Sequence, residues 1–558
     1  MILLIAHRAA QRPLRAALQA AARGLTGCPD IRLVAPAALS LPGWVHDPGS
    51  PAAGRLALDG ETCPAGKVTA VLTALDAVWP ADLPHVRAAD RAFVAGEMTA
   101  FLRGWLAGLD CPVLDPPTAL ALSGPAGERA AWSAAAAALG VPDRQATAVS
   151  RLRAQTVTVA AGRVFGSRPE SVPAEVADTA VALTRAAGVT AARLTFTDDR
   201  TGGVPALSAA IPWWYAPDPL ALRALLERVP ARRRGAAADG PAPAGRRAPR
   251  AAARPGRPLV LLWGVPEEGP LAAVRAALGA LGTPVVLADQ RDALAARFRP
   301  ADGRQPDGPL LTLPGGSLPL SQVTAAYPRP YPSIPELPSD LPARRTARRH
   351  LIRLEHELWH WLGTTTALVA NRPAPAASNG TKSLQSRVAG DCGFAVPESL
   401  LTNDPETALA FAARHGRVIY KGAGGSRTIT GLLDPADTSR LARLGTCPVY
   451  LQRYVAGTNV RVHVVGTEVF AVEITSDTVD YRLAPGELRP ARLPDGVADR
   501  CRTVTAVLGL VLAGIDLIRT PASEWFFLEA NPSPGFTFYP DRDLVGMAIA
   551  RLLSGQVA

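Results

Sequence analysis

Residues 511–535 read VLAGIDLIRTPASEWFFLEANPSPG, and this stretch decides the fold. Two apolar runs, 511–518 and 524–531, hold the aliphatic and aromatic residues that are typical of strands, and the turn residues RTPAS separate them. The stretch therefore predicts a β-hairpin. A helix is expected just before it, over 497–509, because apolar residues recur there at helical spacing and a glycine ends the run.

The hairpin is expected to gather three oxygen-bearing side chains on one face. If its turn is centred on Ala522 and Ser523, Asp516 lies directly across from Glu529, and Asn531 shares the face of Glu529. Two facing carboxylates repel each other unless a cation lies between them, and oxygen ligands without histidine or cysteine suit Mg²⁺ or Mn²⁺. The alternative interpretation is a polar strand end with ordinary solvated acids.

Lysine is scarce in this chain: Lys67, Lys382 and Lys421 stand against 56 arginines in 558 residues. A lysine ammonium is a compact charge suited to one phosphate oxygen, whereas the arginine guanidinium is a wide planar fork. Lys382 opens a helix-like stretch, and Lys421 ends the apolar run 418–421. Two such lysines on separate elements indicate a clamp for nucleotide phosphates. The alternative is that a few lysines remain by chance.

A glycine loop, residues 422–426, follows Lys421 and includes Gly424, Gly425 and Ser426. Glycines let backbone N–H groups approach phosphates and permit a mobile cover, although an ordinary turn is the alternative. The loop differs from the P-loop motif because its lysine precedes the glycines. Together with the carboxylates of the hairpin, the lysines and the loop predict a site for a Mg²⁺-bound nucleoside triphosphate.

Two arginines are candidates to bind the transferred phosphate or a substrate carboxylate. Arg461 and His463 alternate with valines in 459–465, so they share the polar face of a predicted strand. Arg482 follows the next predicted strand, 469–474. Ordinary surface charge is the alternative for both arginines, and His463 is expected to be structural.

The net charge of +11 is concentrated in residues 231–257, which hold eight arginines and one acid. This run lacks the aromatic residues that stack on bases, so a solvated linker is favoured over a nucleic-acid surface, and no nucleic acid is expected. Six cysteines without a CxxC pair indicate neither a zinc site nor a disulfide framework. Because no signal peptide or membrane-spanning apolar run is found, a cytoplasmic protein without a membrane partner is expected.

The two sides of this linker repeat each other. Residues 176–188 match 497–509 without gaps, and the same shift still pairs Leu207 with Leu528; the alternative is chance agreement between alanine-rich helices. On this alignment the first half has lost every charged candidate and lacks a counterpart to residues 400–458. The paired residues are Lys382 with Ala126, Arg461 with Thr158, Asp516 with Thr195, Glu529 with Ser208 and Asn531 with Ala210.

The order of these motifs resembles the ATP-grasp superfamily, and most of all its glutathione synthetases, ribosomal-protein glutamate ligases and graspetide macrocyclases. The most specific motif is LEANPSPG at 528–535, in which an acid precedes Asn-Pro and a glycine. The resemblance implies an α/β fold of the α+β ATP-grasp type over about 258–558, preceded by a shortened, degenerate copy. The expected domains are 1–117 (pre-ATP-grasp-like), 118–230 (degenerate ATP-grasp-like), 231–257 (linker), 258–370 (pre-ATP-grasp), 371–450 (central subdomain with the lysine and the glycine loop) and 451–558 (metal-binding subdomain).

The resemblance also implies roles for the site residues. The two lysines and the glycine loop would bind the phosphates of ATP, and the three hairpin residues would hold Mg²⁺ or Mn²⁺, with two ions expected. The backbone of Gln452, Arg453, Tyr454 and Val455 would hold the adenine. The family often has an acid after this hinge for the ribose; here Arg453 and Asn459 occupy that region, so no ribose contact is assigned.

The activity that the resemblance implies is that of an ATP-dependent ligase. A substrate carboxylate would attack the γ-phosphate to give an acylphosphate, and an amine or a hydroxyl would then displace phosphate; such transfer between anions depends on neutralising charge. The expected partners are ATP and a peptide or amino acid, and a homodimer is allowed. The alternatives are a small-molecule kinase with the ATP-grasp fold and a scaffold protein with a vestigial nucleotide site.

Overall fold

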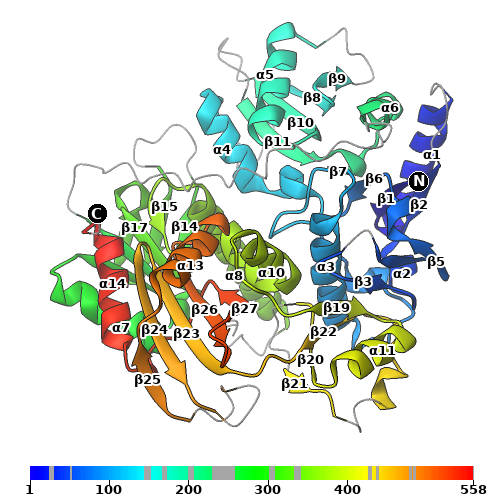
Figure 1. Ribbon diagram of the computed structural model, residues 1–558. Coiled ribbons are helices and arrows are strands. Elements are labelled where there is room, and N and C mark those ends of the chain that lie inside the picture. Colours follow the sequence, from blue (N-terminus) through cyan, green and yellow to red (C-terminus); the bar gives the residue numbers. More distant parts are fainter. Residues whose placement is uncertain are drawn as a thin grey trace. The chain divides into compact units, whose positions relative to one another are not determined.

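The computed structural model describes most of the chain (Figure 1). The described residues are 1–23, 30–50, 53–143, 153–165, 172–198, 206–228, 258–300, 308–331, 341–424, 430–434, 439–476, 481 and 486–556. The predicted linker and three predicted site residues, Gly425, Ser426 and Arg482, lie outside them. The chain forms two compact units: the first comprises Met1–Gly240, Gly380–Leu384 and Glu398–Tyr454, and the second comprises Pro241–Asn379, Gln385–Pro397 and Val455–Ala558.

The first unit contains a parallel sheet in the order β2-β1-β6-β7. Strand β1 is buried on both faces, because Leu3 and Ile5 pack into one apolar core while Ile2 and Leu4 pack into another. Burial on both faces explains why this strand is a continuous apolar run. The elements are β1 Ile2–Ala6, α1 Arg8–Ala22, β2 Ile31–Val34, β6 Ala70–Ala74, α3 Arg91–Gly108, β7 Val113–Leu114 and α6 Pro219–Arg228.

An antiparallel sheet in the order β11-β10-β8-β9 also belongs to the first unit. Helices α4 and α5 pack their apolar residues, among them Trp132 and Leu183, against the inner face of β8 and β10. The elements are α4 Arg129–Leu139, β8 Arg153–Ala160, β9 Arg163–Phe165, α5 Ala174–Ala186, β10 Ala191–Asp198 and β11 Ala206–Pro212.

The segment that bears Lys421 shares a sheet with the N-terminal half, residues 1–230. The order of this sheet is β21-β20-β22-β19-β3-β4-β5, and β19 pairs antiparallel with β3 through Leu401 opposite His46 and Thr402 opposite Val45. In Figure 1 its strands are blue where they come from the N-terminal half and yellow where they come from residues 399–453. The elements are β3 Val45–His46, β4 Arg55–Leu58, β5 Glu61–Pro64, β19 Ser399–Thr402, α11 Pro405–His415, β20 Val418–Lys421, β21 Gly431–Leu432 and β22 Val449–Arg453.

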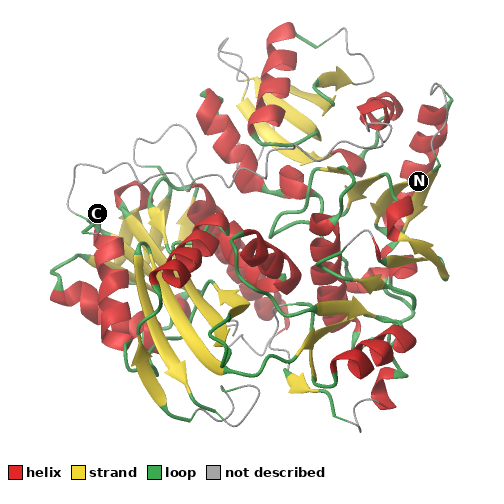
Figure 2. Cartoon of the chain, viewed as in Figure 1, coloured by secondary structure: helices red, strands yellow, loops and turns green. Residues whose placement is uncertain are grey.

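The second unit repeats the parallel sheet, in the order β13-β12-β17-β18, and adds a five-stranded antiparallel sheet in the order β25-β24-β23-β26-β27. Figure 2 shows these strands in yellow beside the red helices that cover them. The strands are β12 Val260–Gly264, β13 Val285–Asp289, β14 Arg297–Arg299, β15 Leu310–Leu313, β16 Gly316–Pro319, β17 Ala325–Arg329, β18 Leu368–Val369, β23 Thr458–Val465, β24 Glu468–Ile474, β25 Leu488–Ala491, β26 Leu512–Arg519 and β27 Trp525–Asn531. The helices are α7 Gly269–Ala280, α8 Leu341–Thr364, α13 Asp495–Val507 and α14 Arg542–Ser554, and α10 Lys382–Asp391 begins in the first unit.

The sequence predictions for the hairpin region are confirmed. Helix α13 forms within two residues of the predicted bounds and ends before Gly509, whose φ of 74° is left-handed. Strands β26 and β27 form the predicted hairpin, and β23, β24 and β20 form where strands are expected. The chain is a mixed α/β protein. Within the described residues, no helix is both long enough and apolar enough to cross a membrane.

The two halves share their strand order. The order β2-β1-β6-β7 matches β13-β12-β17-β18, and β11-β10-β8-β9 matches β27-β26-β23-β24. Helix α5 and strand β10 correspond to α13 and β26 at the shift that the sequence predicts. The internal similarity is therefore a similarity of topology as well as of sequence.

The ladders correct some of the predicted residue pairings between the halves. Arg461 faces Asp516, and the matching pair in the first half is Thr156 and Thr195, so Arg461 corresponds to Thr156 rather than Thr158. The error arose because an alternating valine pattern fits equally well after a shift of two residues. When the hairpins are aligned at their bulges, Glu529 corresponds to Ala209 and Asn531 to Ile211, rather than to Ser208 and Ala210.

The pairing of Lys382 with Ala126 is also wrong. Helix α4 begins at Arg129 and α10 begins at Lys382, and each helix is followed by a glycine and a backbone N–H that bonds back to the residue five positions earlier. These matched ends pair Lys382 with Arg129. The first half therefore keeps a positive charge at this position, contrary to the predicted loss of every charged candidate.

Asp115 and Asn371 occupy the same place in the two halves. Oδ1 of Asp115 accepts a hydrogen bond from the backbone N–H of Thr190 at 2.6 Å, and Oδ1 of Asn371 accepts one from Val511 at 2.8 Å. Burial raises the pKa of Asp115 to about 6, although the hydrogen bonds from Thr190 oppose this. The raised pKa means that the buried carboxylate is most compatible with the folded chain when it is protonated.

Replacing Asp115 with Asn should stabilise the protein at pH 7 and remove a pH dependence. Asp115 makes its full contribution to the free energy of unfolding below its unfolded pKa, near pH 4, and this contribution is lost as the pH rises through 6. At pH 7 the lost free energy of unfolding amounts to roughly 3 kcal/mol. Denaturant unfolding of Asp115→Asn between pH 4 and 8 measures this. The reverse change, Asn371→Asp, is the matched control and should destabilise the protein at pH 7. Identical pH profiles for Asp115→Asn and the wild type would contradict the prediction.

Candidate functional site

Lys421 lies at the end of β20 in the first unit with its side chain buried. Its Nζ donates to Oε1 of Gln452 at 3.1 Å and lies 4.9 Å from the centroid of the Tyr450 ring. Lys421 is directly opposite Tyr450 in the ladder, and Gln452 is opposite Ile419, so these side chains share one face of the sheet. The ladder therefore fixes where the ammonium lies.

Lys382 is the first residue of α10, as the sequence predicts, and it too is buried. Its Nζ donates to the carbonyl oxygen of Gly424, the described end of the glycine loop, at 2.5 Å. The first unit thus brings Lys382, Gly424 and the strand of Lys421 together. An ammonium at a helix N-terminus beside a loop backbone adds to the positive potential that anions seek.

Part of the predicted adenine hinge, residues 452–455, already forms backbone hydrogen bonds within the folded chain. Gln452 and Arg453 belong to strand β22, and the backbone N–H groups of Arg453 and Tyr454 donate to the carbonyl oxygens of Glu398 and Arg417. Adenine would gain these two donors only if those hydrogen bonds broke. Val455 belongs to the second unit and packs with Ile518 and Phe526. The adenine contacts therefore stay a prediction.

Asp516 lies directly opposite Glu529 in the second unit, as the sequence predicts. The register shifts between Asp516 and Leu517, so a β-bulge lies beside the carboxylate, and such bulges re-aim side chains. Asn531 is opposite Gly514, two residues further along β27. The hairpin thus holds the three predicted oxygen donors on one face.

Arg461 is fixed on Asp516 rather than open to solvent. Its Nη1 donates to Oδ1 of Asp516 at 2.8 Å, and the hydroxyl of Tyr481 donates to the same oxygen at 2.9 Å. Burial opposes the charge on Arg461, but the Asp516 carboxylate favours it, and the net shift of the arginine pKa is upward. The glycine at residue 514 leaves room for the Arg461 guanidinium, since a Cβ there would lie 2.3 Å from Nη2 of Arg461. Direct binding of a substrate anion by Arg461 stays a prediction.

His463 shares the face of Arg461, as the alternation predicts, and is fully buried. Burial lowers the pKa of its imidazole, and its ring lies 5.2 Å from that of Tyr539, centroid to centroid. These surroundings favour a neutral, packed histidine, in keeping with the structural role that the sequence suggests.

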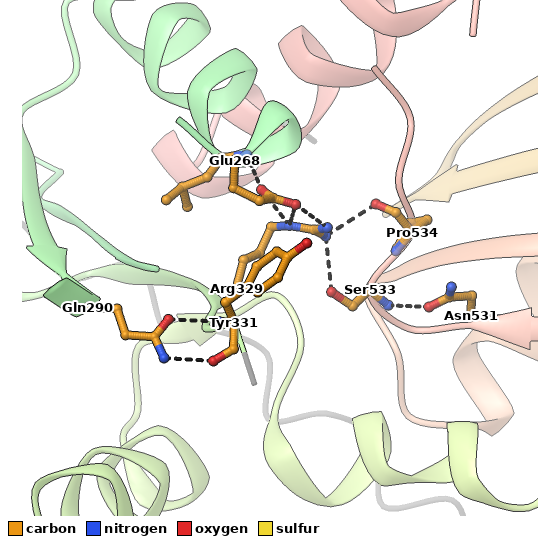
Figure 3. A network of polar contacts seen from close by, with 8 residues as sticks. Glu268, Gln290, Arg329, Tyr331, Asn531, Ser533 and Pro534 are labelled. Carbon is orange, nitrogen blue, oxygen red and sulfur yellow. Dashed lines mark hydrogen bonds and ion pairs between the residues drawn. The ribbon is translucent and has the colours of Figure 1, made fainter. Parts of the chain in front are cut away.

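A polar network reaches the turn after β27 from the parallel sheet of the second unit (Figure 3). Arg329, at the carboxyl end of β17, pairs with Glu268 at 2.7 Å and donates to Oγ of Ser533 at 3.0 Å. The backbone N–H of Ser533 in turn donates to Oδ1 of Asn531 at 2.9 Å. Glu268 also caps α7 by accepting from Leu271, so the network orients the Asn531 amide from a rigid helix terminus.

The three hairpin donors fit a hard divalent cation. Two facing carboxylates and one amide oxygen are the ligand types that Mg²⁺ prefers. No cluster of three His, Cys, Asp or Glu side chains able to hold a metal occurs in the described part of the chain. An ion at Asp516, Glu529 and Asn531 would therefore complete its shell with water and with oxygens of the bound substrate, which is usual for Mg²⁺ at phosphate-transfer sites.

Sequence reasoning missed the residues that support this hairpin. Tyr481 contacts Asp516, and Arg329 and Glu268 act on the Asn531 turn through Ser533. One signal was available for Arg329, which follows a parallel strand at its carboxyl end, where functional side chains gather. Nothing in the sequence connects Tyr481 with Asp516 before the chain folds.

Solved structures of ligases are among those similar to this chain. No protein-family model and no curated protein matches the chain. Three solved structures are similar over about half of it. The macrocyclase MdnC of Microcystis aeruginosa, bound with precursor peptide MdnA, is 22% identical over 53% of this chain and 99% of its own, with a TM-score of 0.47. A RiPP-associated ATP-grasp ligase of Chryseobacterium gregarium, in complex with ADP and a leader and core peptide, is 20% identical over 54% of this chain and 98% of its own, with a TM-score of 0.47. The ATP-grasp ligase PsnB, complexed with a precursor variant, Mg and ADP, is 26% identical over 53% and 98%, with a TM-score of 0.44.

Every one of the three TM-scores is below 0.5. The assignment of function to this chain therefore rests on its own residues.

Proposed function

We propose that this chain is an ATP-dependent ligase that joins a carboxylate to an amine or a hydroxyl through an acylphosphate, with a peptide or an amino acid as substrate. One observation carries the proposal: Asp516 faces Glu529 beside Asn531 in a single hairpin, a donor set for Mg²⁺ that ordinary strands avoid because facing carboxylates repel. The buried lysines of the first unit supply the second requirement, positive charge for phosphate oxygens. The substrate class follows from the family resemblance.

The residues take the following roles in this proposal. Lys382 and Lys421 bind phosphate oxygens of ATP, and Asp516, Glu529 and Asn531 hold two Mg²⁺ ions. Mg²⁺ bound there would neutralise the charge of the transferred phosphoryl group. Arg461 and Arg482 stabilise the oxygens of the acylphosphate, Arg461 from its fixed position on Asp516, and the backbone of residues 452–455 binds adenine. Because transfer between anions is limited by charge repulsion, no histidine base is needed.

Trapping with hydroxylamine tests the reaction class. The protein is incubated with Mg²⁺, ATP, hydroxylamine and a panel of amino acids and peptides. A ligase forms an acylphosphate and ADP, and hydroxylamine displaces phosphate to give a hydroxamate in an amount that matches the ADP released. A kinase would release ADP and leave a phosphorylated hydroxyl without hydroxamate. A scaffold with a vestigial site would release no ADP, and either of these outcomes refutes the proposal.

Lysine-to-arginine changes test the phosphate clamp. Lys421→Arg and Lys382→Arg keep the charge, but a planar guanidinium replaces a compact ammonium in a buried place, so we expect the KM for ATP to rise about 10–100-fold, the value of one or two charge-assisted hydrogen bonds. Lys67→Arg is the matched control, because Lys67 is exposed, and should leave the KM unchanged. Steady-state kinetics with varied ATP measure the effect, and equal KM values for all three variants would remove the lysines from the site.

We also infer that the two halves arose by duplication. Their shared strand orders support this, as does the replacement of a site contact by a neutral one: where Arg461 pairs with Asp516, Thr156 bonds to Thr195 at 3.0 Å. Ala209 and Ile211 stand where the second half has Glu529 and Asn531. At the described positions that correspond to the three donors, the first half therefore has a threonine, an alanine and an isoleucine in place of metal ligands.

A further inference from the structure

Helix α3 of the N-terminal half places a carboxylate against the glycine loop. Glu97 on α3 is only 5% exposed, and both of its side-chain oxygens lie 3.2 Å from the backbone nitrogen of Gly424, which donates to them. A buried carboxylate loses much favourable hydration, so it is retained only where hydrogen bonds or charges compensate. The contact with Gly424 is therefore a specific feature of the fold rather than incidental packing.

A side chain at residue 424 would displace the Glu97 carboxylate. A Cβ at this position would lie 2.6 Å from Oε1 of Glu97 and 3.7 Å from Cβ of Ala100, the next turn of α3. The first of these distances is a severe overlap. The glycine at residue 424 allows the loop backbone to approach α3 closely, in addition to the flexibility that the sequence suggests.

Both backbone groups of Gly424, its N–H and its carbonyl oxygen, form hydrogen bonds with charged side chains. The N–H of Gly424 donates to Glu97, while its carbonyl oxygen accepts from Nζ of Lys382 at 2.5 Å. Charge-assisted hydrogen bonds of this kind are about twice as strong as neutral ones. Glu97 and Lys382 together therefore fix the orientation of the loop where it leaves the strand of Lys421.

Helix α3 also packs against neighbours of both lysines. Phe101 of α3 shares an apolar core with Ala423 and Tyr450, which flank Lys421 along the chain and across the ladder. At Gly104, α3 approaches the start of α10 so closely that a Cβ would lie 2.0 Å from Oγ of Ser383, the neighbour of Lys382. One helix of the N-terminal half thus packs beside both lysines and against Gly424.

We propose that Glu97 is a positioning residue of the nucleotide site: it fixes the backbone at Gly424, beside Lys382, for the phosphates of ATP, and through it the N-terminal half is an integral part of that site. The inference rests on the proposed ligase function. Ordering a loop before binding removes an entropic cost from the binding step, about 1–2 kcal/mol per backbone residue fixed. Loss of Glu97 should therefore weaken ATP binding more than it slows turnover at saturating ATP.

Kinetics of Glu97 variants test the proposal on the full chain. Glu97→Ala should raise the KM for ATP about 10-fold or more and change kcat by less than about 3-fold, as expected when ground-state binding is lost. Glu97→Gln keeps an oxygen that can accept from Gly424 and should recover most of the affinity. Glu61→Ala, at an exposed position of β5 in the same half, is the matched control and should leave the KM unchanged.

A double-mutant cycle tests the contact itself. Gly424→Ala in the wild-type background forces the added methyl group against Glu97 and should raise the KM for ATP. In the Glu97→Ala background the overlap with the carboxylate is gone, so the same change should cost clearly less than its single effect. Additive effects would show that Glu97 and Gly424 act independently and would overturn the proposal.

Direct binding of Mg²⁺ with a non-hydrolysable ATP analogue, measured by calorimetry, separates this proposal from the proposed function. If the wild type binds no analogue, the nucleotide site itself is refuted. If the wild type binds and Glu97→Ala binds equally well, the positioning role is refuted. Tighter binding by Glu97→Ala would mean that the carboxylate competes with the phosphates, which also refutes it. Should Glu97→Ala fail to fold, Glu97→Leu takes its place: weaker binding of the analogue supports the proposal, and wild-type affinity overturns it.

Discussion

Deletion of residues 1–230 is expected to abolish ATP binding by the remaining chain. The deletion removes β3, β4 and β5 from the seven-stranded sheet. Strand β19 then becomes an edge strand that pairs with β22 on one side and has lost β3 on the other. It also removes partners of two buried side chains: Thr402 donates to the carbonyl oxygen of Trp44, and Asn403 accepts from the N–H groups of Gly43 and Trp44. Each buried polar group left without a partner costs about 1–3 kcal/mol.

The apolar losses are larger. Leu401, Ala423 and Tyr450 are buried in a core whose other members come from the N-terminal half, among them Trp44, Phe101 and Trp105. Re-exposing a large apolar side chain costs about 1.5–3 kcal/mol. Together with the polar losses this approaches the whole stability of a typical domain, about 5–15 kcal/mol. The lysine-bearing segment should therefore not keep its fold.

Calorimetry with the Mg²⁺-bound ATP analogue and near-UV circular dichroism measure the result. A full chain with a protease site introduced between residues 240 and 245 is the matched control. After cleavage it keeps all of the N-terminal half, so it should stay one particle and bind as before, because the β3–β19 ladder and the shared core join the pieces. Wild-type affinity in the deleted chain would show that the N-terminal half is an accessory, contrary to the prediction.

Glu529→Gln is expected to lower turnover about 10²–10³-fold while it raises stability in the absence of divalent cations. Removing one group that stabilises the charge of the transition state typically costs that much in kcat, and Glu529 would act through the metal ion that it holds. Without a cation, the change relieves repulsion between facing carboxylates, worth about 0.2–1 kcal/mol, which corresponds to a rise of about 1–4 °C in Tm. Arg461 already pairs with Asp516 and offsets part of this repulsion, so the gain in stability should lie at the low end of this range. A gain in stability together with a loss of turnover is the result expected of a cation ligand.

Glu524→Gln on the same hairpin is the matched control, because Glu524 is exposed at the turn, and it should change neither quantity. ATP-dependent turnover over a range of Mg²⁺ and Mn²⁺ concentrations, and thermal melts with and without the ion, measure both effects. If Glu529→Gln loses stability with and without the ion, Glu529 is a structural residue and the metal assignment fails.

The hairpin and the order of motifs could be predicted because the information is local. Alternating and apolar runs define the strands, and the turn residues 519–523 place the hairpin to within one residue of its register. Asp516 faces Glu529 because a β-bulge shifts the register beyond Leu517, which faces Phe527. The same local rules failed in the alternating valines of β8, where Thr158 was aligned with Arg461 although the ladder assigns Thr156. A two-residue period cannot distinguish registers that differ by two.

The sequence by itself determined the secondary elements, the hairpin to within one residue of its register, the scarcity of lysine and the family resemblance. Only the tertiary structure decided that β3 joins β19, that Arg461 is fixed on Asp516, that Arg329 reaches the Asn531 turn, and that Glu97 meets Gly424. The physical reason is that strand edges and buried carboxylates carry no label for their partners. More than three hundred residues of chain lie between Glu97 and Gly424. Which partner each finds depends on how the cores pack, and packing is a property of the folded chain as a whole.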